Sequence, residues 1–316
     1  LNGGVLGQDS IQRCLYRGKI YWFWGDTSRA AYPLGNFAMS GATSELPPPL
    51  GSGLDPSKGI DLTYFTGPDG FSRSMCPIEG QPGPVWCDGM TTVADKSGRE
   101  RLLCHFARMK SLGEMYEQGF ALYNDDKELF EPIKRFPLDA ALFMRGNPVR
   151  VKNDDGDYWY FASPLPLVRC RADYESLLDL SRYEAYTCLE PGTRYDATHP
   201  RLDRRADALV YGWKRDTGLV LQKEQNELIG KGLMKADEAL IQLRDASTGK
   251  PVLAHAGTVA WNPYCGRWLM IVQELLGTSV CGEIWLATAP SLTGPWGPAR
   301  KIITHDDYSF YNVAHH

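Results

Sequence analysis

The chain has 316 residues, of which 43% are hydrophobic and 23% are charged, so it can build a sizeable core and does not have the composition of a disordered protein. Its formal net charge is −4 and it contains no long basic run, which makes nucleic acid a poor partner. No stretch approaches the roughly 18 apolar residues that a membrane-spanning helix needs, so no membrane partner is expected either.

Aromatic and turn-forming residues are both abundant. The chain has 9 Trp, 16 Tyr and 11 Phe beside 32 Gly and 21 Pro. Aromatic residues favour pleated surfaces, whereas Gly and Pro favour tight turns. This composition predicts many short strands joined by turns.

A hairpin unit recurs four times along the chain. In each copy an apolar strand leads through a turn rich in Gly, Asn or Asp into a second strand, which is aromatic in most copies. The paired strands are 10–16 with 20–24, 90–94 with 101–106, 148–151 with 158–162, and 258–261 with 267–272. A third strand is expected after each pair, at 37–46, 120–129, 168–177 and 285–292.

Repeated antiparallel units of this kind are typical of propeller blades. Four units and the beginning of a fifth at 310–316 predict an all-β, five-bladed β-propeller whose fifth blade is incomplete, forming a single domain over 1–316. A β-sandwich is the alternative, although it would not need the recurring aromatic strand.

The segment 204–249 interrupts the regular spacing of the units. Its patterns predict helix at 224–229 and 236–241, so we expect a small helical insertion there. A separate domain is disfavoured because the segment has too little apolar content for its own core.

Eight cysteines are spread along the chain without a close CxxC pair, at 14, 76, 87, 104, 170, 188, 265 and 281. A zinc ribbon is therefore not expected. Disulfide bonds and buried free thiols both remain open.

Polar side chains recur where the hairpins begin and end. In an antiparallel hairpin the start of the first strand lies beside the end of the second, and in a propeller every first strand lines one channel. We therefore expect a common rim that gathers Asp9, Asp26, Trp86, Asp88, His105, Arg145, Asn147, His255 and Glu274. Trp24, Tyr32, Tyr64 and Tyr116 are further rim aromatics that could stack on sugars.

Several rim residues also have simpler explanations. Asp9 and Asp26 could each cap a turn, and His255 could be a hydrogen-bonded histidine of the channel. Glu238 and Glu283 are assigned to the charged surface. The joint position of Asp9 and Asp26 at the open end of one hairpin favours a functional role, because glycosidic cleavage needs two carboxyl groups and a third can raise the pKa of the acid.

Two first-unit motifs, Gly7–Ser10 and Gly18–Thr27, resemble the five-bladed propeller glycoside hydrolases of the arabinanase, β-xylosidase and levansucrase clan. The spacing of Asp9 and Asp26 looks still more like that of the endo-D-arabinanase-type propellers. Val85–Asp88 is similar to the segment in which this clan places the aspartate that tunes the acid. The catalytic Glu of the clan has no clear counterpart, since Asn147–Pro148 and His255–Gly257 stand at the comparable strand starts.

The resemblance implies a secreted or periplasmic, monomeric glycoside hydrolase that acts on a polysaccharide or oligosaccharide. Asp9 would be the base or nucleophile, Asp26 or Glu274 the acid, and Asp88 a modulator of the acid or a sugar ligand. The residues expected to bind substrate are Trp86, His105, Arg145, Asn147 and His255. A Ca²⁺ ion in the central channel is a further expectation, although no Ca²⁺-binding loop motif is present. A non-catalytic glycan-binding propeller and a protein-interaction propeller are the alternatives.

Overall fold

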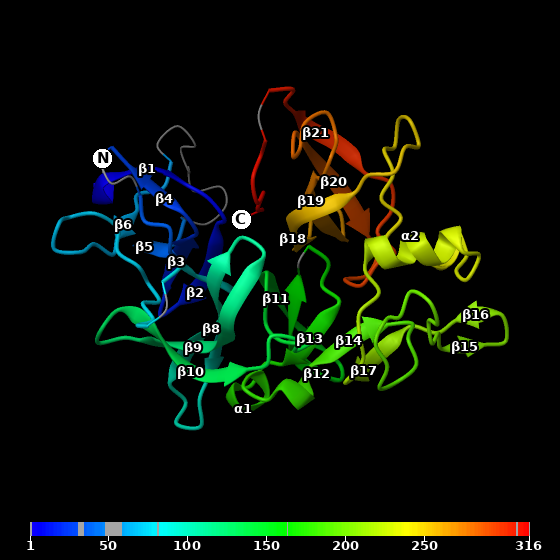
Figure 1. Ribbon diagram of the computed structural model, residues 1–316, viewed down its shortest axis with the longest axis horizontal. Helices are drawn as coiled ribbons and strands as arrows, with labels where there is room; N and C mark the ends of the chain where they lie inside the picture. The colour runs from blue at the N-terminus through cyan, green and yellow to red at the C-terminus, as the bar shows by residue number, and fades with distance from the viewer. Residues whose placement is uncertain are drawn as a thin grey trace. The chain divides into compact units, whose positions relative to one another are not determined.

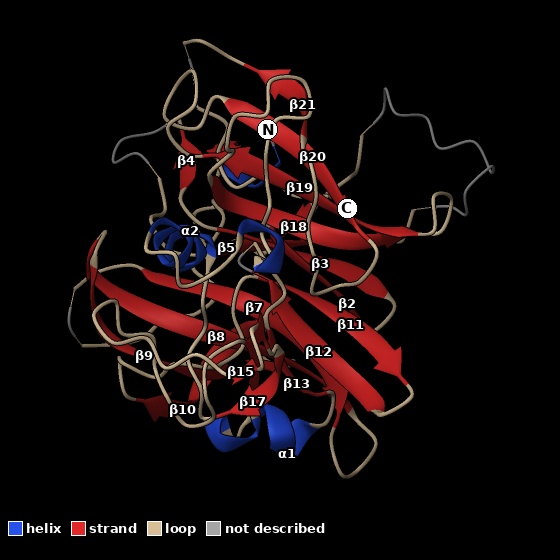
Figure 2. Cartoon of the chain, turned by 90° about the vertical axis from the view of Figure 1, so that its right-hand side faces the viewer, coloured by secondary structure: helices blue, strands red, loops and turns tan. Residues whose placement is uncertain are grey.

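The computed structural model describes residues 2–30, 35–47, 59–80, 82–162, 164–307 and 309–315. Nearly all of its regular structure is antiparallel strand, which confirms the predicted all-β class (Figure 2). The chain divides into two compact units, Leu1–Asp139 and Ala140–His316. The single domain over 1–316 remains a prediction.

The first unit contains two four-stranded antiparallel sheets and one short ribbon (Figure 1). One sheet has the order β2 (Gln12–Tyr16), β3 (Lys19–Trp24), β5 (Ser40–Ser44) and β6 (Thr63–Tyr64). The other runs β7 (Val85–Ala94), β8 (Glu100–Ser111), β9 (Glu114–Asn124) and β10 (Leu129–Phe136). The ribbon pairs β1 (Val5–Gln8) with β4 (Thr27–Arg29), and a short 3-10 turn, η1 (Asn2–Gly4), precedes it.

The second unit contains a five-stranded and a four-stranded sheet. The five-stranded sheet has the order β11 (Asn147–Asn153), β12 (Gly156–Ala162), β13 (Val168–Arg171), β14 (Glu184–Thr187) and β17 (Gly212–Arg215). The four-stranded sheet runs β18 (Ala254–Asn262), β19 (Arg267–Glu274), β20 (Glu283–Ala289) and β21 (Arg300–Thr304). Its remaining elements are α1 (Tyr174–Leu177), α2 (Gln222–Gly230), η2 (Leu180–Arg182), η3 (Ala236–Glu238), β15 (Arg204–Arg205) and β16 (Ala208–Leu209).

The four predicted hairpins are confirmed by their registers. The pairs β2–β3, β7–β8, β11–β12 and β18–β19 are all antiparallel. The expected third strand at 168–177 ends early, at Arg171, because Asp173 caps α1 by accepting a hydrogen bond from Ser176 N. Described residues 309–315 contain no strand, so the fifth blade stays a prediction.

The segment 204–249 is more than an inserted loop. The helix expected at 224–229 is confirmed as α2, whereas the one expected at 236–241 is only the 3-10 turn η3, since the backbone at Ala239 is extended. Strand β17 joins the five-stranded sheet beside β14. The segment also shares a small apolar cluster, made of Cys188, Leu189, Val220, Leu228, Met234 and Ala239. Two members of this cluster, Cys188 and Leu189, lie outside the segment, so the segment packs together with the preceding part of the unit.

The aromatic second strand of the first unit is covered on both faces. Tyr21 and Phe23 face the main core between the two sheets, where Phe23 is fully buried. Trp22 and Trp24 face the opposite side and stack with their ring centroids 6.5 Å apart. Trp24 is only 8% exposed, so its predicted role as a rim aromatic for sugar stacking is wrong. Tyr32, another predicted rim aromatic, lies outside the described residues.

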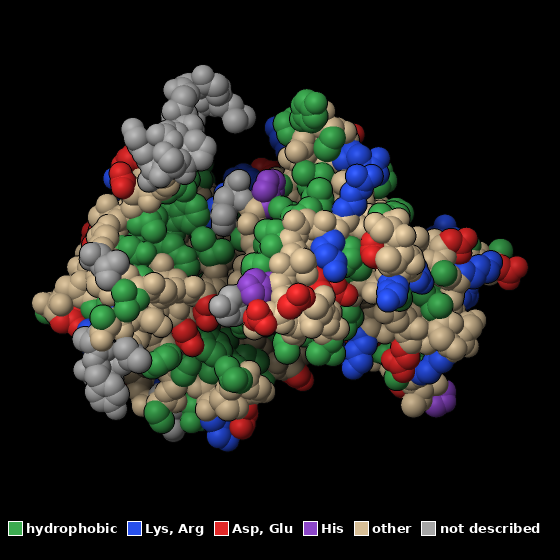
Figure 3. All heavy atoms as spheres, turned by 90° about the horizontal axis from the view of Figure 1, so that it is seen from above, with side chains coloured by type: hydrophobic (Ala, Val, Ile, Leu, Met, Phe, Trp, Pro, Cys, Tyr) green, Lys and Arg blue, Asp and Glu red, His purple; other side chains and the backbone are tan. Residues whose placement is uncertain are grey.

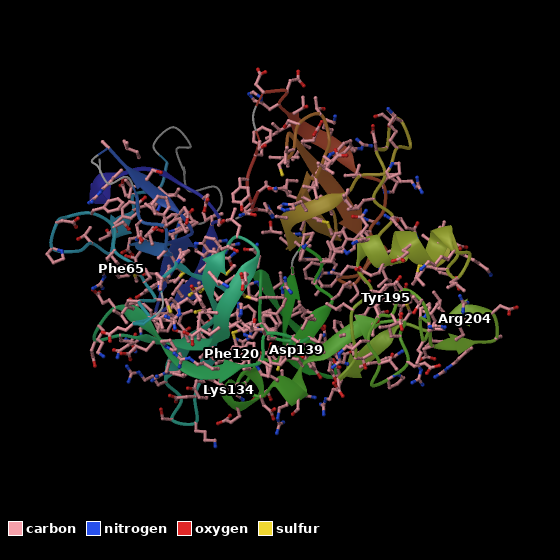
Figure 4. The ribbon with its side chains drawn as sticks, in the orientation of Figure 1. Phe65, Phe120, Lys134, Asp139, Tyr195 and Arg204 are labelled. Atoms are coloured by element: carbon pink, nitrogen blue, oxygen red, sulfur yellow. The ribbon has the colours of Figure 1, made fainter. Side chains whose placement is uncertain are left out.

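The pairing of β9 with β10 includes a bulge at Ile133, between Pro132 and Lys134. Directly after the bulge Lys134 pairs with Phe120, and Figure 4 labels both residues. A Cβ on Gly119, the neighbour of Phe120, would overlap the carbonyl oxygen of Lys134 and lie 2.7 Å from the ring of Phe106. The closeness of the two backbones therefore depends on a residue without a side chain at position 119.

All eight cysteines are free, and seven of them are buried. Burial raises the pKa of the Cys104 thiol to about 11, and it raises the pKa values of Cys14 and Cys170 further. Cys265, in the turn between β18 and β19, is exposed. Since a thiol reacts as its thiolate and must be reached by the reagent, Cys265 is the accessible one.

None of the described helices is long and apolar enough to cross a membrane. On the face shown in Figure 3, basic and acidic side chains of the described residues are interspersed.

We expect a thiol-reactive dye to label one cysteine in the native protein and eight after denaturation, because only Cys265 is both free and exposed. Mass spectrometry of the labelled chain would count the adducts. Cys265→Ser should reduce native labelling to none. Six or fewer labelled cysteines in the denatured, unreduced wild type would show that a disulfide exists.

Gly119→Ala should lower the free energy of unfolding by about 1–3 kcal/mol, the usual cost of forcing an extra methyl group into a packed site. Chemical denaturation would measure it. Gly113→Ala is the matched control on the turn before β9, since a Cβ there meets nothing within 4 Å. Equal stability of the two variants would contradict the packing described at Gly119.

Candidate active site

Three hydrogen bonds hold Asp9 beside Gly25 and Asp26 at the junction of two ladders. Asp9 N donates to Asp26 O at 3.2 Å, Gly25 N donates to Asp9 O at 2.9 Å, and Asp26 N donates to Asp9 Oδ1 at 3.0 Å. The antiparallel run continues beyond the pair as β1 and β4. The two aspartates therefore lie side by side just beyond the open end of the β2–β3 hairpin, as the sequence predicted, and the structure adds the ribbon that follows them.

The backbone around this pair is constrained. Ser10, directly after Asp9, has φ 54°, in the left-handed region that residues with a side chain rarely adopt. Such conformations persist only where surrounding contacts hold them, and they are found most often near functional sites. Here the hydrogen bonds of Asp9 to Gly25 and Asp26 provide those contacts.

The carboxyl group of Asp26 has a raised pKa. Its burial is the largest cause, and the charge of Asp9 adds to it. Trp86 Nε1 acts in the opposite direction by donating to Asp26 Oδ1 at 3.2 Å. Asp26 therefore keeps its proton to a higher pH than an ordinary aspartic acid does.

Asp88 and His105 lie opposite each other on β7 and β8, as predicted. His105 Nδ1 lies 2.8 Å from Asp88 Oδ1, and His105 Nε2 lies 3.2 Å from Gln118 Oε1. Gln118 Nε2 donates to Pro137 O at 2.7 Å, and this bond turns the amide oxygen toward the imidazole. His105 Nε2 must then donate, so one proton is left for Asp88 and Nδ1 to share.

This arrangement bears on the role expected for Asp88. A carboxylate that shares a proton with an imidazole is a weak source of like charge. The causes that raise the pKa of Asp26 are burial and Asp9, and Asp88 is not among them. Within the first unit, Asp9 is the residue that modulates Asp26.

The second unit holds the other predicted site residues. Gln273 Nε2 donates to His255 Nδ1 at 2.8 Å, and Asn147 Nδ2 lies 3.5 Å from Gly257 O. Arg145 is exposed, and its guanidinium lies 5.7 Å from the centre of the Phe143 ring. His255 is thus hydrogen-bonded through Nδ1, in agreement with the simpler explanation given for it above. Its side chain, which carries Nε2, is exposed.

Glu274, at the end of β19, lies in a second cluster of charged groups. Its Oε2 accepts a hydrogen bond from Trp285 Nε1 at 2.7 Å. Burial raises the pKa of Glu274, and the neighbouring Glu283 raises it further. Both Asp26 and Glu274 therefore have the property expected of a proton donor.

Glu283 is the residue that sequence reasoning missed. It was assigned to the charged surface, but it is only 1% exposed. The pattern of β20 carried the signal, because Glu283, Trp285, Ala287 and Ala289 alternate onto one buried face. A charged residue in phase with a buried Trp indicates an inward-pointing carboxyl group.

In the first unit, hydrogen bonds connect Asp9, Asp26 and Trp86, and a further contact joins Asp88 to His105. In the second unit, Asn147, His255 and Glu274 each bond to a different neighbour, namely Gly257, Gln273 and Trp285. The rim shared by all these residues remains a prediction. Among the described residues, no three His, Cys, Asp or Glu side chains are grouped as a metal site would need, so no residue set for the expected Ca²⁺ ion can be named.

Comparison with known proteins gives a likeness in fold. No family model and no curated protein sequence matches the chain. An exo-β-1,3-galactanase from Phanerochaete chrysosporium is 12% identical, with a TM-score of 0.43 over 94% of this chain. A GH43_1 enzyme from Xanthomonas citri is 12% identical, with a TM-score of 0.42, and the match covers 95% of this chain and 74% of that one. An endo-arabinase from Bacteroides thetaiotaomicron is 12% identical, with a TM-score of 0.41, and the match covers 97% and 84%.

The chain spans about half the length of the galactanase, of which the match covers 50%. Likeness at this level assigns no role to any residue, so the roles below rest on the contacts within this chain.

Asp26→Asn should make the protein more stable at neutral pH. A raised pKa contributes stability below the ordinary carboxyl pKa of about 4, and this contribution is lost as the pH rises through the pKa of the folded state. An amide never ionises, so the variant avoids that loss while still accepting the Trp86 hydrogen bond. Thermal unfolding should show the gain at pH 7 and none near pH 3.

Asp69→Asn is the control of opposite sign. The backbone of Phe71 and the guanidinium of Arg29 hold the pKa of Asp69 low, so its amide variant should lose stability at pH 7. A loss of stability at pH 7 in both variants would contradict the environment assigned to Asp26.

Proposed function

We propose that the protein is a glycoside hydrolase that cleaves a polysaccharide or oligosaccharide with the Asp9–Asp26 pair. The observation that carries this proposal is that two adjacent carboxyl groups have different environments. Burial raises the pKa of Asp26, and the negative charge of Asp9 raises it further. Paired carboxyl groups of this kind are suited to acid and base roles in one reaction.

The roles follow from these environments. Asp26 keeps its proton and would donate it to the oxygen of the leaving sugar. Asp9 would act as the ionised carboxylate, either activating water or attacking the anomeric carbon. Trp86 binds Asp26 Oδ1 and Phe37 O through one indole N–H, so it would hold the acid in place.

Asp88 and His105 would form a fixed hydrogen-bonding pair beside the acid. Asp88 and Trp86 lie two residues apart on β7, so their side chains point to the same face of the sheet. The carboxyl group of Asp88 would accept hydrogen bonds from sugar hydroxyl groups, and His105 would hold that carboxyl group in place. We therefore assign Asp88 to substrate binding.

The blade arrangement also belongs to the proposal. We propose that the four larger sheets are propeller blades, because three of them are four-stranded antiparallel sheets whose strands follow chain order. The fourth has the same order in its first four strands and then adds β17.

Asp9→Asn and Asp26→Asn should each reduce sugar release by about 10²–10⁴-fold, the usual contribution of an acid or base group. A panel of arabinan, galactan, xylan and bacterial polysaccharides would be incubated with each variant, and new reducing ends would be measured. Both amides keep their hydrogen-bonding oxygens, so the site geometry is retained. If thermal unfolding shows Asp26→Asn to be as stable at pH 7 as expected, unfolding is excluded as the cause of its lost activity.

Asp126→Asn is the matched control, because Asp126 is an exposed carboxylate of the same unit on the β9–β10 turn. Sugar release that survives both Asp9→Asn and Asp26→Asn would overturn the proposal. Binding of a polysaccharide without release by the wild type would favour a glycan-binding protein instead.

A further inference from the structure

Two glutamates of the second unit meet across a glycine. Glu274 ends β19 and Glu283 begins β20, and the loop between them contains Gly277. A Cβ on Gly277 would overlap Glu283 Oε2 and lie 3.1 Å from Glu274 Oε2. Both carboxyl oxygens therefore converge on one point beside the backbone of residue 277.

The two carboxyl groups are held in different ways. Glu283 Oε1 accepts hydrogen bonds from Thr278 N, at 2.6 Å, and from Thr278 Oγ1. Lys301 Nζ lies 3.7 Å from the same oxygen. The backbone N–H and hydroxyl of Thr278 and the ammonium group of Lys301 are the kinds of group that a carboxylate prefers as partners.

The other oxygen of Glu283 has no such support. Glu283 is 1% exposed, and its Oε2 is buried without a hydrogen-bond partner among the described residues. A buried polar atom without a partner is costly, and Glu274 Oε2 approaches the same point beside Gly277. A proton retained on Glu274 would remove the repulsion between the two oxygens.

The charged groups around Glu274 come from three sides. Glu283 on β20 and Asp245 raise the pKa of Glu274, and Lys301 on β21 lowers it, while burial is the largest cause of the net rise. On β18, the cross-strand partner of Glu274 is Ala254, and the adjacent His255 is bonded to Gln273 instead. Two carboxylates, Glu283 and Asp245, and one lysine therefore act on Glu274.

We infer that Glu283 is a positioning residue for Glu274: anchored by Thr278 and Lys301 across Gly277, it leaves Glu274 as the member of the pair that retains a proton. Gly277 makes this possible because any side chain there would push the carboxyl groups apart. Trp285 completes the arrangement by donating to Glu274 and packing its ring 5.1 Å from Lys301 Nζ. The inference rests on the proposed function only where Glu274 is taken as a second proton donor for sugar cleavage.

The test follows the titration of Glu274 itself. The full chain labelled with ¹³C at the glutamate carboxyl carbons would be titrated by NMR, with Glu274 assigned from the Glu274→Gln spectrum. In Glu283→Gln the amide can still accept from Thr278 but carries no charge, so Glu274 should lose its proton at lower pH than in the wild type. In Lys301→Met the midpoint should move to higher pH.

Opposite shifts in these two variants separate a positioning role from a structural one, since damage to the fold would not move the midpoint in opposite directions. If Glu283→Gln does not fold, Gly277→Ala replaces it, because the added methyl group separates the carboxyl groups without removing a charge. An unchanged Glu274 midpoint in the folded variant would overturn the inference.

A measurement of sugar release against pH distinguishes this inference from the proposed function. If the wild type releases sugar, the alkaline limb of its pH–rate profile should move to lower pH in Glu283→Gln, as the NMR midpoint does. If no polysaccharide is cleaved, the proposed function fails, and the NMR midpoints still decide the inference. The NMR midpoint of Glu274 could shift while the pH–rate profile stays unchanged. This result would confirm that Glu283 controls the titration of Glu274 and would show that Glu274 is not the proton donor in sugar cleavage.

Discussion

The burial of β3 on both faces is the constraint on which the first unit depends. Tyr21 and Phe23 pack into the core between two sheets, and Trp22 and Trp24 pack on the other side. A slip of one residue would exchange these two faces, so the strand has one register with β2 and one with β5. This register places Asp26, which lies two residues after Trp24, beside Asp9.

The same constraint explains why the paired carboxyl groups lie where the strand ladders end. Inside a ladder the backbone groups are paired and alternate side chains are buried, so carboxyl groups there would be costly. At the junction of β1–β4 with β2–β3, and at the loop between β19 and β20, backbone N–H groups are free to meet carboxylates. Both carboxyl pairs lie at such positions, and in both pairs burial and a like charge raise one pKa.

The sequence predicted the hairpins well because the signal is local. Each turn has its Gly or Asn, and each second strand has its run of apolar residues, so all four pairs were found. The extension of the ladder beyond Asp9 and Asp26 was missed, since Val5–Gln8 and Thr27–Arg29 have no strand pattern of their own and pair only through tertiary context. Burial of Trp24 was missed for a related reason, because Tyr64, which is distant in the sequence, packs against it.

Gly277 illustrates a different kind of sequence constraint. It is not among the glycines with a positive φ, so its backbone could be adopted by any amino acid. The restriction comes instead from two acidic side chains that occupy the space a methyl group would need. In an alignment of natural variants, this position should therefore vary together with Glu274 and Glu283: wherever either acid is replaced by a smaller neutral residue, alanine or serine should become tolerated in place of the glycine.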